Sequence, residues 1–131
     1  MDTNSDKSLK ILIWVLKIGV FGIFLGHGLY AFQIHPSWIL FLETVGFPTI
    51  SAIKIMPYIG SLDILVAISV LIKPLRFILI WAVFWAFLTA LIRPIAGGSI
   101  LDFIERSGNW ATPLALLILI NIQKKYSSIL I

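Results

Sequence analysis

Four largely apolar runs decide what this chain can fold into. They cover residues 9–32, 49–72, 75–96 and 109–123. One membrane-spanning helix needs about 20 mostly apolar residues. Charged residues make up only 12% of the 131 residues, roughly half the share of an ordinary soluble domain. The sequence therefore predicts an all-α integral membrane protein, a single domain built as a bundle of four membrane-spanning helices.

Two short segments between these runs have the pattern of helices that lie at the membrane interface. Residues 38–47 are too few to span a bilayer, and Ser37 is expected to cap their start. Residues 100–106 alternate apolar and charged side chains, and Ser99 and Asp102 match a capping signal there. We predict a short interfacial helix in each segment.

The distribution of cations predicts how the bundle is oriented. One side of the predicted membrane carries seven cations, and the other side has the remaining three of the ten. The seven are Lys7, Lys10, Lys17, Lys73, Arg76, Lys124 and Lys125. The positive-inside rule then places both termini in the cytoplasm and both interfacial helices on the outer side. We expect a bacterial cytoplasmic membrane protein whose surroundings are the lipid bilayer, and no nucleic-acid partner, because the cations form no patch with interleaved aromatic residues.

The chain contains no cysteine. This excludes disulfides, thiolate metal ligands and dithiol redox chemistry. A redox role would need a bound cofactor or a mobile carrier, and no covalent cofactor is expected. Haem ligation by His27 and His35 is possible by residue type, but Pro36 is expected to end the helix between them and no further motif supports haem.

Arg93 is the residue from which a search for function starts, because it lies near the end of the third apolar run. An arginine at membrane depth costs about 2.5 to 3.5 kcal/mol, so it is normally paired or faces a wet cavity. Helical spacing places it on a stripe of small side chains, with Trp85 alongside. The stripe serves either close helix packing, with Gly22 and Gly26 as partners, or a cavity for a narrow lipophilic ligand. Its members are Ala82, Ala86, Thr89 and Ala90.

His27 and Asp63 are the other polar residues within the predicted spans that need a partner. His27 lies between two glycines and is suited either to proton exchange and ligand contact or to a structural hydrogen bond between helices. Asp63 lies in the middle of the second span, where a carboxylate is either structural or part of a proton relay. Both interpretations stay open for each residue.

Four segments resemble the DoxX-like family of small four-helix membrane proteins. They are residues 24–29, 60–66, 93–94 and 105–115, and together they sample nearly the whole chain. The resemblance implies a relationship to the quinone-linked DoxD subunit of a thiosulfate-oxidising enzyme, and so a quinone as a possible cofactor. The family often has a glutamate where Asp63 stands. Broader relatives have thiol redox roles, which a chain without cysteine cannot share.

The first class of function is the binding of a quinone-like or other lipophilic molecule in an outward-facing pocket, either alone or as a subunit of a membrane redox system. His27 and Arg93 would polarise an oxygen of the ligand, and Glu105 would pair with Arg93 or relay a proton. Asn109 would donate a hydrogen bond. Trp38, Trp85 and Trp110 would cover the ring or anchor the interfacial helices. Such a site combines an apolar cleft with a few convergent polar groups.

The second class is a non-catalytic interaction or assembly subunit, in which the same polar groups are structural. Its partner would be a membrane or peripheral redox protein or a second copy of the chain. A third alternative is transport by a small four-helix exporter. The first span lacks the carboxylate that such proteins use, and Asp63 could replace it only in a different geometry. Whether the protein is an enzyme stays open.

Overall fold

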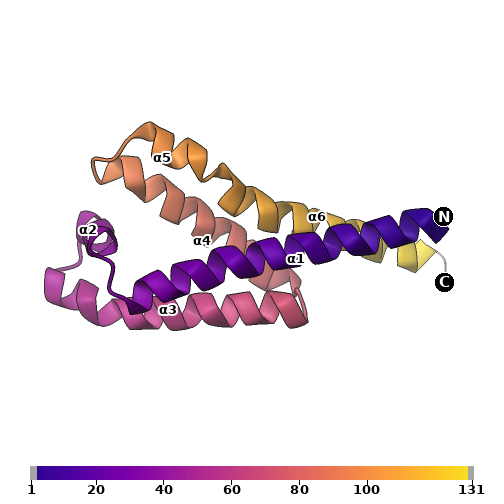
Figure 1. Cartoon of the computed structure of the whole chain (residues 1–131), viewed down its shortest axis with the longest axis horizontal. Coiled ribbons are helices and arrows are strands. Elements are labelled where there is room, and N and C mark those ends of the chain that lie inside the picture. The colour runs from indigo at the N-terminus through magenta and orange to yellow at the C-terminus, as the bar shows by residue number, and fades with distance from the viewer. Residues whose placement is uncertain (1–2, 130–131) are drawn as a thin grey trace.

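The computed structural model describes residues 3–129 and is helical throughout that range apart from short connections (Figure 1). The predicted all-α fold is confirmed for these residues. The order of helices is α1 (Thr3–Phe32), α2 (Pro36–Thr44), α3 (Thr49–Ile72), α4 (Arg76–Ile95), α5 (Ile100–Glu105) and α6 (Ser107–Ile129).

Three helices, α1, α3 and α4, are long and apolar enough to cross a membrane. Their length and hydropathy are compatible with an integral membrane protein. The helix α6 has 23 residues, but Ser107 and Asn109 lie in its first turn and polar residues predominate after Gln123, so its apolar part is short. Its membrane crossing as a fourth span stays a prediction.

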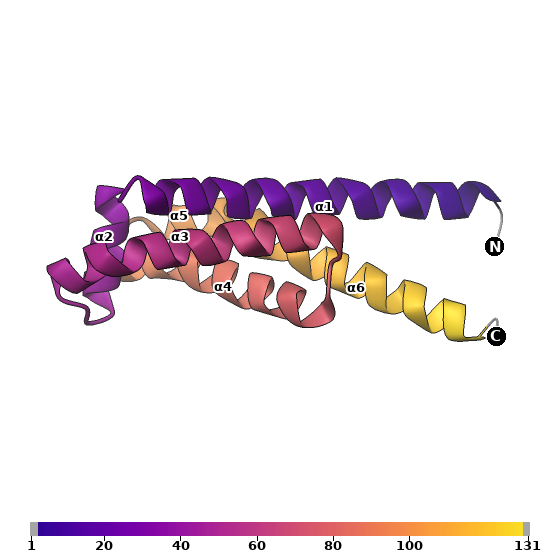
Figure 2. The same ribbon diagram turned by 90° about the horizontal axis from the view of Figure 1, so that it is seen from below.

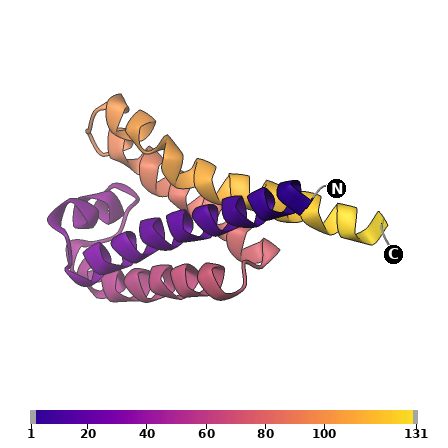
Figure 3. The same ribbon diagram turned by 45° about the vertical axis from the view of Figure 1, so that its right-hand side comes forward.

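The four long helices form two antiparallel pairs. The helix α1 packs along α3, and α4 packs along α6 (Figures 1 and 2). The two pairs diverge toward one end of the molecule, where α2 and α5 lie (Figures 1 and 3). The beginning of α1 and the end of α6 lie at the opposite end. Both short helices therefore lie at the same end of the bundle.

One core joins all four long helices. Its buried members are Val20 and Phe24 of α1, Val66, Ala67 and Val70 of α3, Leu79, Ala82 and Ala86 of α4, and Leu116 and Ile120 of α6. The outward-facing side chains are also apolar, as at Ile50, Leu65 and Phe77, each more than 60% exposed. A helix that is apolar on every side is typical of a membrane span.

The closest approach between α1 and α3 involves Gly28 and Gly60. A Cβ atom on Gly60 would lie 2.8 Å from the Gly28 carbonyl oxygen, and one on Gly28 would lie 2.9 Å from the Gly60 carbonyl oxygen. Small residues allow such contact between membrane helices. Gly22 and Gly26 were expected to pack against the small-residue stripe of α4, and this expectation is wrong, because a Cβ on either would meet nothing within 4 Å.

The small residues of α4 are buried, as close packing predicts. Ala82, Ala86 and Ala90 are at most 1% exposed, and the first two belong to the core with Phe24 and Leu116. Close packing therefore accounts for these alanines, although they pack with Phe24 and Leu116 and not with the expected Gly22 and Gly26. Thr89, the fourth member of the stripe, is only partly buried and lines a cavity.

The start of α2 differs from the sequence prediction. The helix begins at Pro36, with His35 as the N-cap residue and no side-chain cap, so the expected cap at Ser37 is wrong. Proline is favoured in the first helical turn because its fixed φ suits the helix and its missing N–H costs no hydrogen bond there. The predicted end at residue 47 is also too late, since α2 ends at Thr44.

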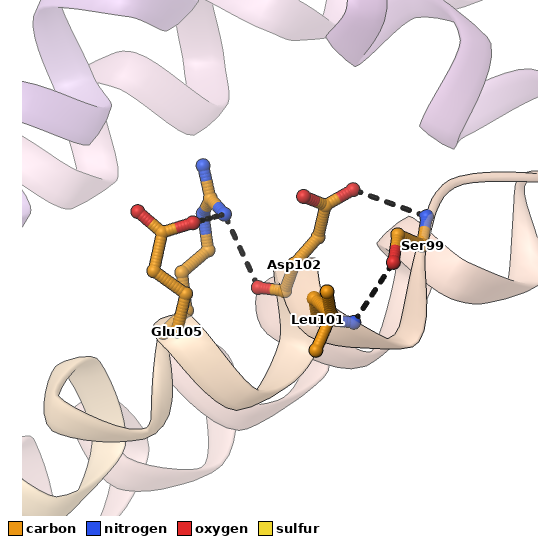
Figure 4. Close-up of polar contacts among 5 residues, drawn as sticks. Ser99, Leu101, Asp102 and Glu105 are labelled. Atoms are coloured by element: carbon orange, nitrogen blue, oxygen red, sulfur yellow. Dashed lines mark hydrogen bonds and ion pairs between the residues drawn. The ribbon is translucent and has the colours of Figure 1, made fainter.

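The capping signal before α5 is confirmed. The Leu101 backbone N–H donates to Ser99 Oγ at 3.1 Å, and the Ser99 backbone N–H donates to Asp102 Oδ2 at 3.2 Å (Figure 4). The two side chains thus satisfy backbone groups that a helix start leaves free. This signal is local in sequence, which is why the sequence alone reveals it.

Candidate functional site

A cavity of about 290 Å³ lies between α2, α3 and α4, at the end of the molecule where the two helix pairs diverge. Its wall is almost entirely apolar. The helix α2 contributes Trp38, Phe41 and Leu42, and Val45 follows directly after it; α3 contributes Met56 and Ile59, and α4 contributes Trp85, Leu88, Thr89, Leu91, Ile92, Arg93 and Ile95. Two of the predicted site residues, Trp85 and Arg93, are therefore on one wall.

Arg93 is the charged residue on the cavity wall. It lies in the last turn of α4, and its guanidinium carbon is 5.2 Å from the centre of the Phe41 ring on α2, which is a cation–π distance. Its Nε atom is buried and has no hydrogen-bond partner. The neighbouring hydroxyl of Thr89 already donates to the Ala86 carbonyl at 3.0 Å. The guanidinium thus keeps a free donor at the cavity.

His27 is a residue of α1 and is not among the residues that line the cavity. Its ring meets the Trp38 ring edge to face, with the centres 5.5 Å apart. Its Nδ1 atom is buried without a partner. His27 is thus in contact with the cavity wall through Trp38.

Asp63 is deeper in the bundle than the cavity. It is 1% exposed, and neither carboxylate oxygen has a hydrogen-bond partner. The indole Nε1 of Trp85, a residue of the cavity wall, also has no hydrogen-bond partner. The Trp85 ring stacks on Trp81, with the ring centres 5.5 Å apart and the planes 11° from parallel.

Glu105 and Asn109 do not lie on the cavity wall. Glu105 is exposed and pairs with its neighbour Arg106 at 3.5 Å (Figure 4). Within residues 3–129 no ion pair joins it to Arg93, so the expected Arg93–Glu105 pair is absent there. Asn109 is half-buried, and its backbone N–H donates to the Arg106 carbonyl at 2.9 Å. The structure brings together only part of the predicted site.

Sequence reasoning missed the contribution of α2 and α3 to this wall. Three residues of α2, at positions 38, 41 and 42, and the residue after the helix, at position 45, line the cavity. Spacings of three, four and seven are those of one apolar helix face. That spacing could have shown that α2 covers something apolar. Met56 and Ile59 carry no comparable signal, since every face of α3 is apolar.

The part of the chain that the structure describes holds no group of three or more histidine, cysteine, aspartate or glutamate side chains that could bind a metal ion. No protein-family model, curated protein or solved structure matches this chain. The candidate site therefore has to be interpreted from its own geometry.

Proposed function

We propose that this protein is a four-helix integral membrane protein that binds a lipophilic, quinone-like molecule between α2, α3 and α4. The observation that carries the proposal is an almost wholly apolar cavity with a single guanidinium on its wall, whose Nε has no partner. A buried donor without a partner is costly. An oxygen atom on an otherwise apolar ligand would satisfy it.

The size of the cavity suits one ring. Its volume of about 290 Å³ is near the lower end of small-molecule sites, which span about 300 to 1,000 Å³. An apolar cavity of about 150 Å³ is sufficient for benzene, so there is room for a substituted ring. Arg93 would donate to a carbonyl oxygen of that ring, while Trp38, Phe41 and Trp85 supply aromatic contacts.

The resemblance to the DoxX-like family supports a quinone as the ligand class. It also favours a role as a subunit beside a membrane or peripheral redox partner. Under this proposal His27 acts through Trp38, which it touches and which lines the cavity. Glu105 and Asn109 would orient the nearby α5–α6 segment, because neither lines the cavity.

We also propose that α6 is the fourth span, that α2 and α5 lie at the outer interface, and that both termini are cytoplasmic. The position of α2 and α5 at the same end of the bundle supports this arrangement.

The orientation is tested with single introduced cysteines. Because the chain has no cysteine of its own, labelling of each variant shows on which side of the membrane the introduced cysteine lies. In intact cells we expect a membrane-impermeant maleimide to label Glu43→Cys and Ile104→Cys, and to label Lys73→Cys and Ser127→Cys only after permeabilisation. Labelling of Ser127→Cys in intact cells would contradict α6 as a fourth span in this orientation.

The ligand is tested by mass spectrometry of organic extracts from protein purified in a mild detergent. Wild-type protein should carry a near-stoichiometric lipophilic compound with an oxygen acceptor. Arg93→Ala should reduce its amount by about tenfold or more, because a hydrogen bond to a charged group is lost. Arg93→Lys should retain part of it, and Lys54→Ala, which changes an exposed cation of α3, is the matched control.

Two results would reject ligand binding. One is an extract in which no compound distinguishes wild type from Arg93→Ala. The other is an Arg93→Ala protein that carries the same compound but unfolds at a lower temperature. The second result would favour an assembly subunit in which Arg93 is structural.

A further inference from the structure

A second cavity lies between α3 and α4, toward the end where the two helices are connected. Its volume is about 390 Å³. Its wall comes from one face of each helix, with Leu62, Leu65, Val66 and Ser69 of α3 and Phe77, Ile78 and Trp81 of α4. Leu65 and Phe77 are each more than 60% exposed, so the cavity is a groove that opens on the outer surface of the bundle.

The groove exists because α3 and α4 each pack mainly against another helix. The helix α3 packs along α1, and α4 packs along α6, while α3 and α4 share few contacts (Figure 2). Both are long and apolar enough to cross a membrane. Where two such helices leave a surface groove with an apolar wall, the acyl chains of the bilayer lie against it.

Two cations stand where the groove reaches the connection between α3 and α4. Lys73 follows Ser69 by four residues, and its backbone N–H donates to the Ser69 carbonyl at 2.8 Å, so it lies about one helical turn beyond the groove wall. Arg76 directly precedes Phe77 of that wall. Both cations are exposed, and no ion pair with another described residue engages either of them. An apolar groove thus has a positively charged end.

The start of α4 adds attraction for an anion at the same end. Leu75 is the N-cap residue of α4 and provides no side-chain cap. The first backbone N–H groups of a helix have no partner within the helix, and together they carry a partial positive charge. A phosphate group at this position would meet these donors as well as the two cationic side chains.

Trp81 supplies a polar group at the next level of the groove. It follows Arg76 by five residues, about 7.5 Å along α4. It lines the groove, and its buried Nε1 has no hydrogen-bond partner. A phospholipid carries ester oxygens between its phosphate and its acyl chains, and these oxygens accept hydrogen bonds. Cations, an indole and then aliphatic side chains thus follow one another along the groove in the order of the groups of a phospholipid.

We propose that this groove binds an anionic phospholipid, with its phosphate at Lys73, Arg76 and the start of α4 and one acyl chain along the groove. From Lys73 to Leu62 is eleven residues, about 16 Å along the helix axis. This is about half of a hydrocarbon core of roughly 30 Å, so the groove suits the depth of one leaflet. The orientation proposed above makes it the cytoplasmic leaflet, where basic pockets between membrane helices bind anionic headgroups.

This site requires α3 and α4 to cross the membrane, as proposed above, but it does not require a ligand in the first cavity. The walls of the two cavities have no residue in common. Arg93 lies in the last turn of α4, and Arg76 is the first residue of that helix. The two sites therefore use different charges at opposite ends of α4.

The test compares phosphatidylglycerol with phosphatidylcholine of the same acyl chains. Binding to the full chain in detergent is measured by native mass spectrometry. Wild-type protein should bind one phosphatidylglycerol about tenfold or more tightly than phosphatidylcholine, because each Lys or Arg near an anionic headgroup contributes roughly fivefold. The double variant Lys73→Gln/Arg76→Gln should lose this preference. Equal binding of the two lipids by folded wild-type protein would overturn the proposal.

The matched control for charge is Lys124→Gln/Lys125→Gln, which removes two exposed cations near the end of α6. It should keep the preference for phosphatidylglycerol. An equal loss in both double variants would show a general attraction to positive charge and contradict a site at the α3–α4 connection. Glycerol 3-phosphate, which has the phosphate without acyl chains, should not displace the lipid. Displacement would identify a site for soluble phosphate esters and reject a lipid site.

The role of the groove is tested with Ser69→Phe, which places a ring in the wall. It should weaken binding of phosphatidylglycerol by about tenfold although both cations remain, because side chain and acyl chain would compete for the same space. Ile68→Phe is the control, since Ile68 is exposed and lies outside the wall. Unchanged binding by Ser69→Phe would place the lipid outside the groove and overturn the proposal.

Arg93→Ala separates this site from the proposed quinone-like site. The variant should lose the quinone-like compound from its extracts and keep its preference for phosphatidylglycerol. Lys73→Gln/Arg76→Gln should show the reverse. Loss of the lipid preference in folded Arg93→Ala protein would contradict a lipid site confined to this groove.

Discussion

Replacing Gly60 with leucine should leave little folded protein. A Cβ at this position would lie 2.8 Å from the Gly28 carbonyl oxygen, 3.1 Å from the Phe32 ring and 3.2 Å from the Ala31 Cβ. The nearest of these atoms belongs to the backbone and cannot move without separating α1 from α3. Overpacking usually costs about 1 to 3 kcal/mol, and a rigid backbone contact places this variant at or above the upper end. Thermal unfolding and gel filtration in detergent measure the effect.

The matched comparison uses alanine at two glycines. Gly60→Ala should unfold at a clearly lower temperature than wild type. Gly26→Ala should unfold at the same temperature or slightly higher, because a Cβ at Gly26 meets nothing within 4 Å and alanine favours a helix by roughly 0.5 to 1 kcal/mol. Equal destabilisation by both substitutions would show that α1 and α3 do not cross at Gly28 and Gly60.

Replacing Ile59 with tryptophan should empty the first cavity of its ligand while the bundle stays folded. Ile59 lines that cavity from α3, and the larger ring would occupy space that the proposal assigns to a ligand. We expect the extracted quinone-like compound to fall by about tenfold or more, because ligand and side chain would compete for the same volume. The thermal midpoint should change little, since the ring fills existing space.

The control for this experiment is Ile53→Trp, which adds the same ring to an exposed position of α3. It should leave the ligand content unchanged. A large loss of stability in Ile59→Trp would mean that the cavity cannot take a ring of this size. Unchanged ligand content would place the ligand outside this cavity and leave the proposed function without its site.

The helices themselves were predictable from the sequence. The predicted span 49–72 coincides with α3, and the span 75–96 differs from α4 by one residue at each end. Runs of apolar residues report the length of membrane helices directly. The capping box before α5 was equally predictable, because Ser99 and Asp102 act within a single helical turn.

The partners of individual side chains were not predictable. The choice of Gly22 and Gly26 as contact positions was wrong, because helices that are apolar on every side give no sign of which face meets a neighbour. Glu105 was expected either to pair with Arg93 or to relay a proton; in the structure Arg93 lies over Phe41 of α2 and Glu105 pairs with Arg106. These pairings depend on where α2 and α5 pack at the end of the bundle, which is a tertiary feature.

The sequence by itself determined that this chain is helical, that its long helices suit a membrane and that few polar residues lie within them. These properties follow from local composition and from spacing along one helix. Only the tertiary structure decided which polar residues meet. It placed Arg93 on a cavity wall beside Phe41 of α2, and it buried Asp63 within the bundle. Such contacts join residues far apart in the chain. They depend on the rotation of each helix about its own axis and on the angles at which helices cross, and a run of apolar residues specifies neither.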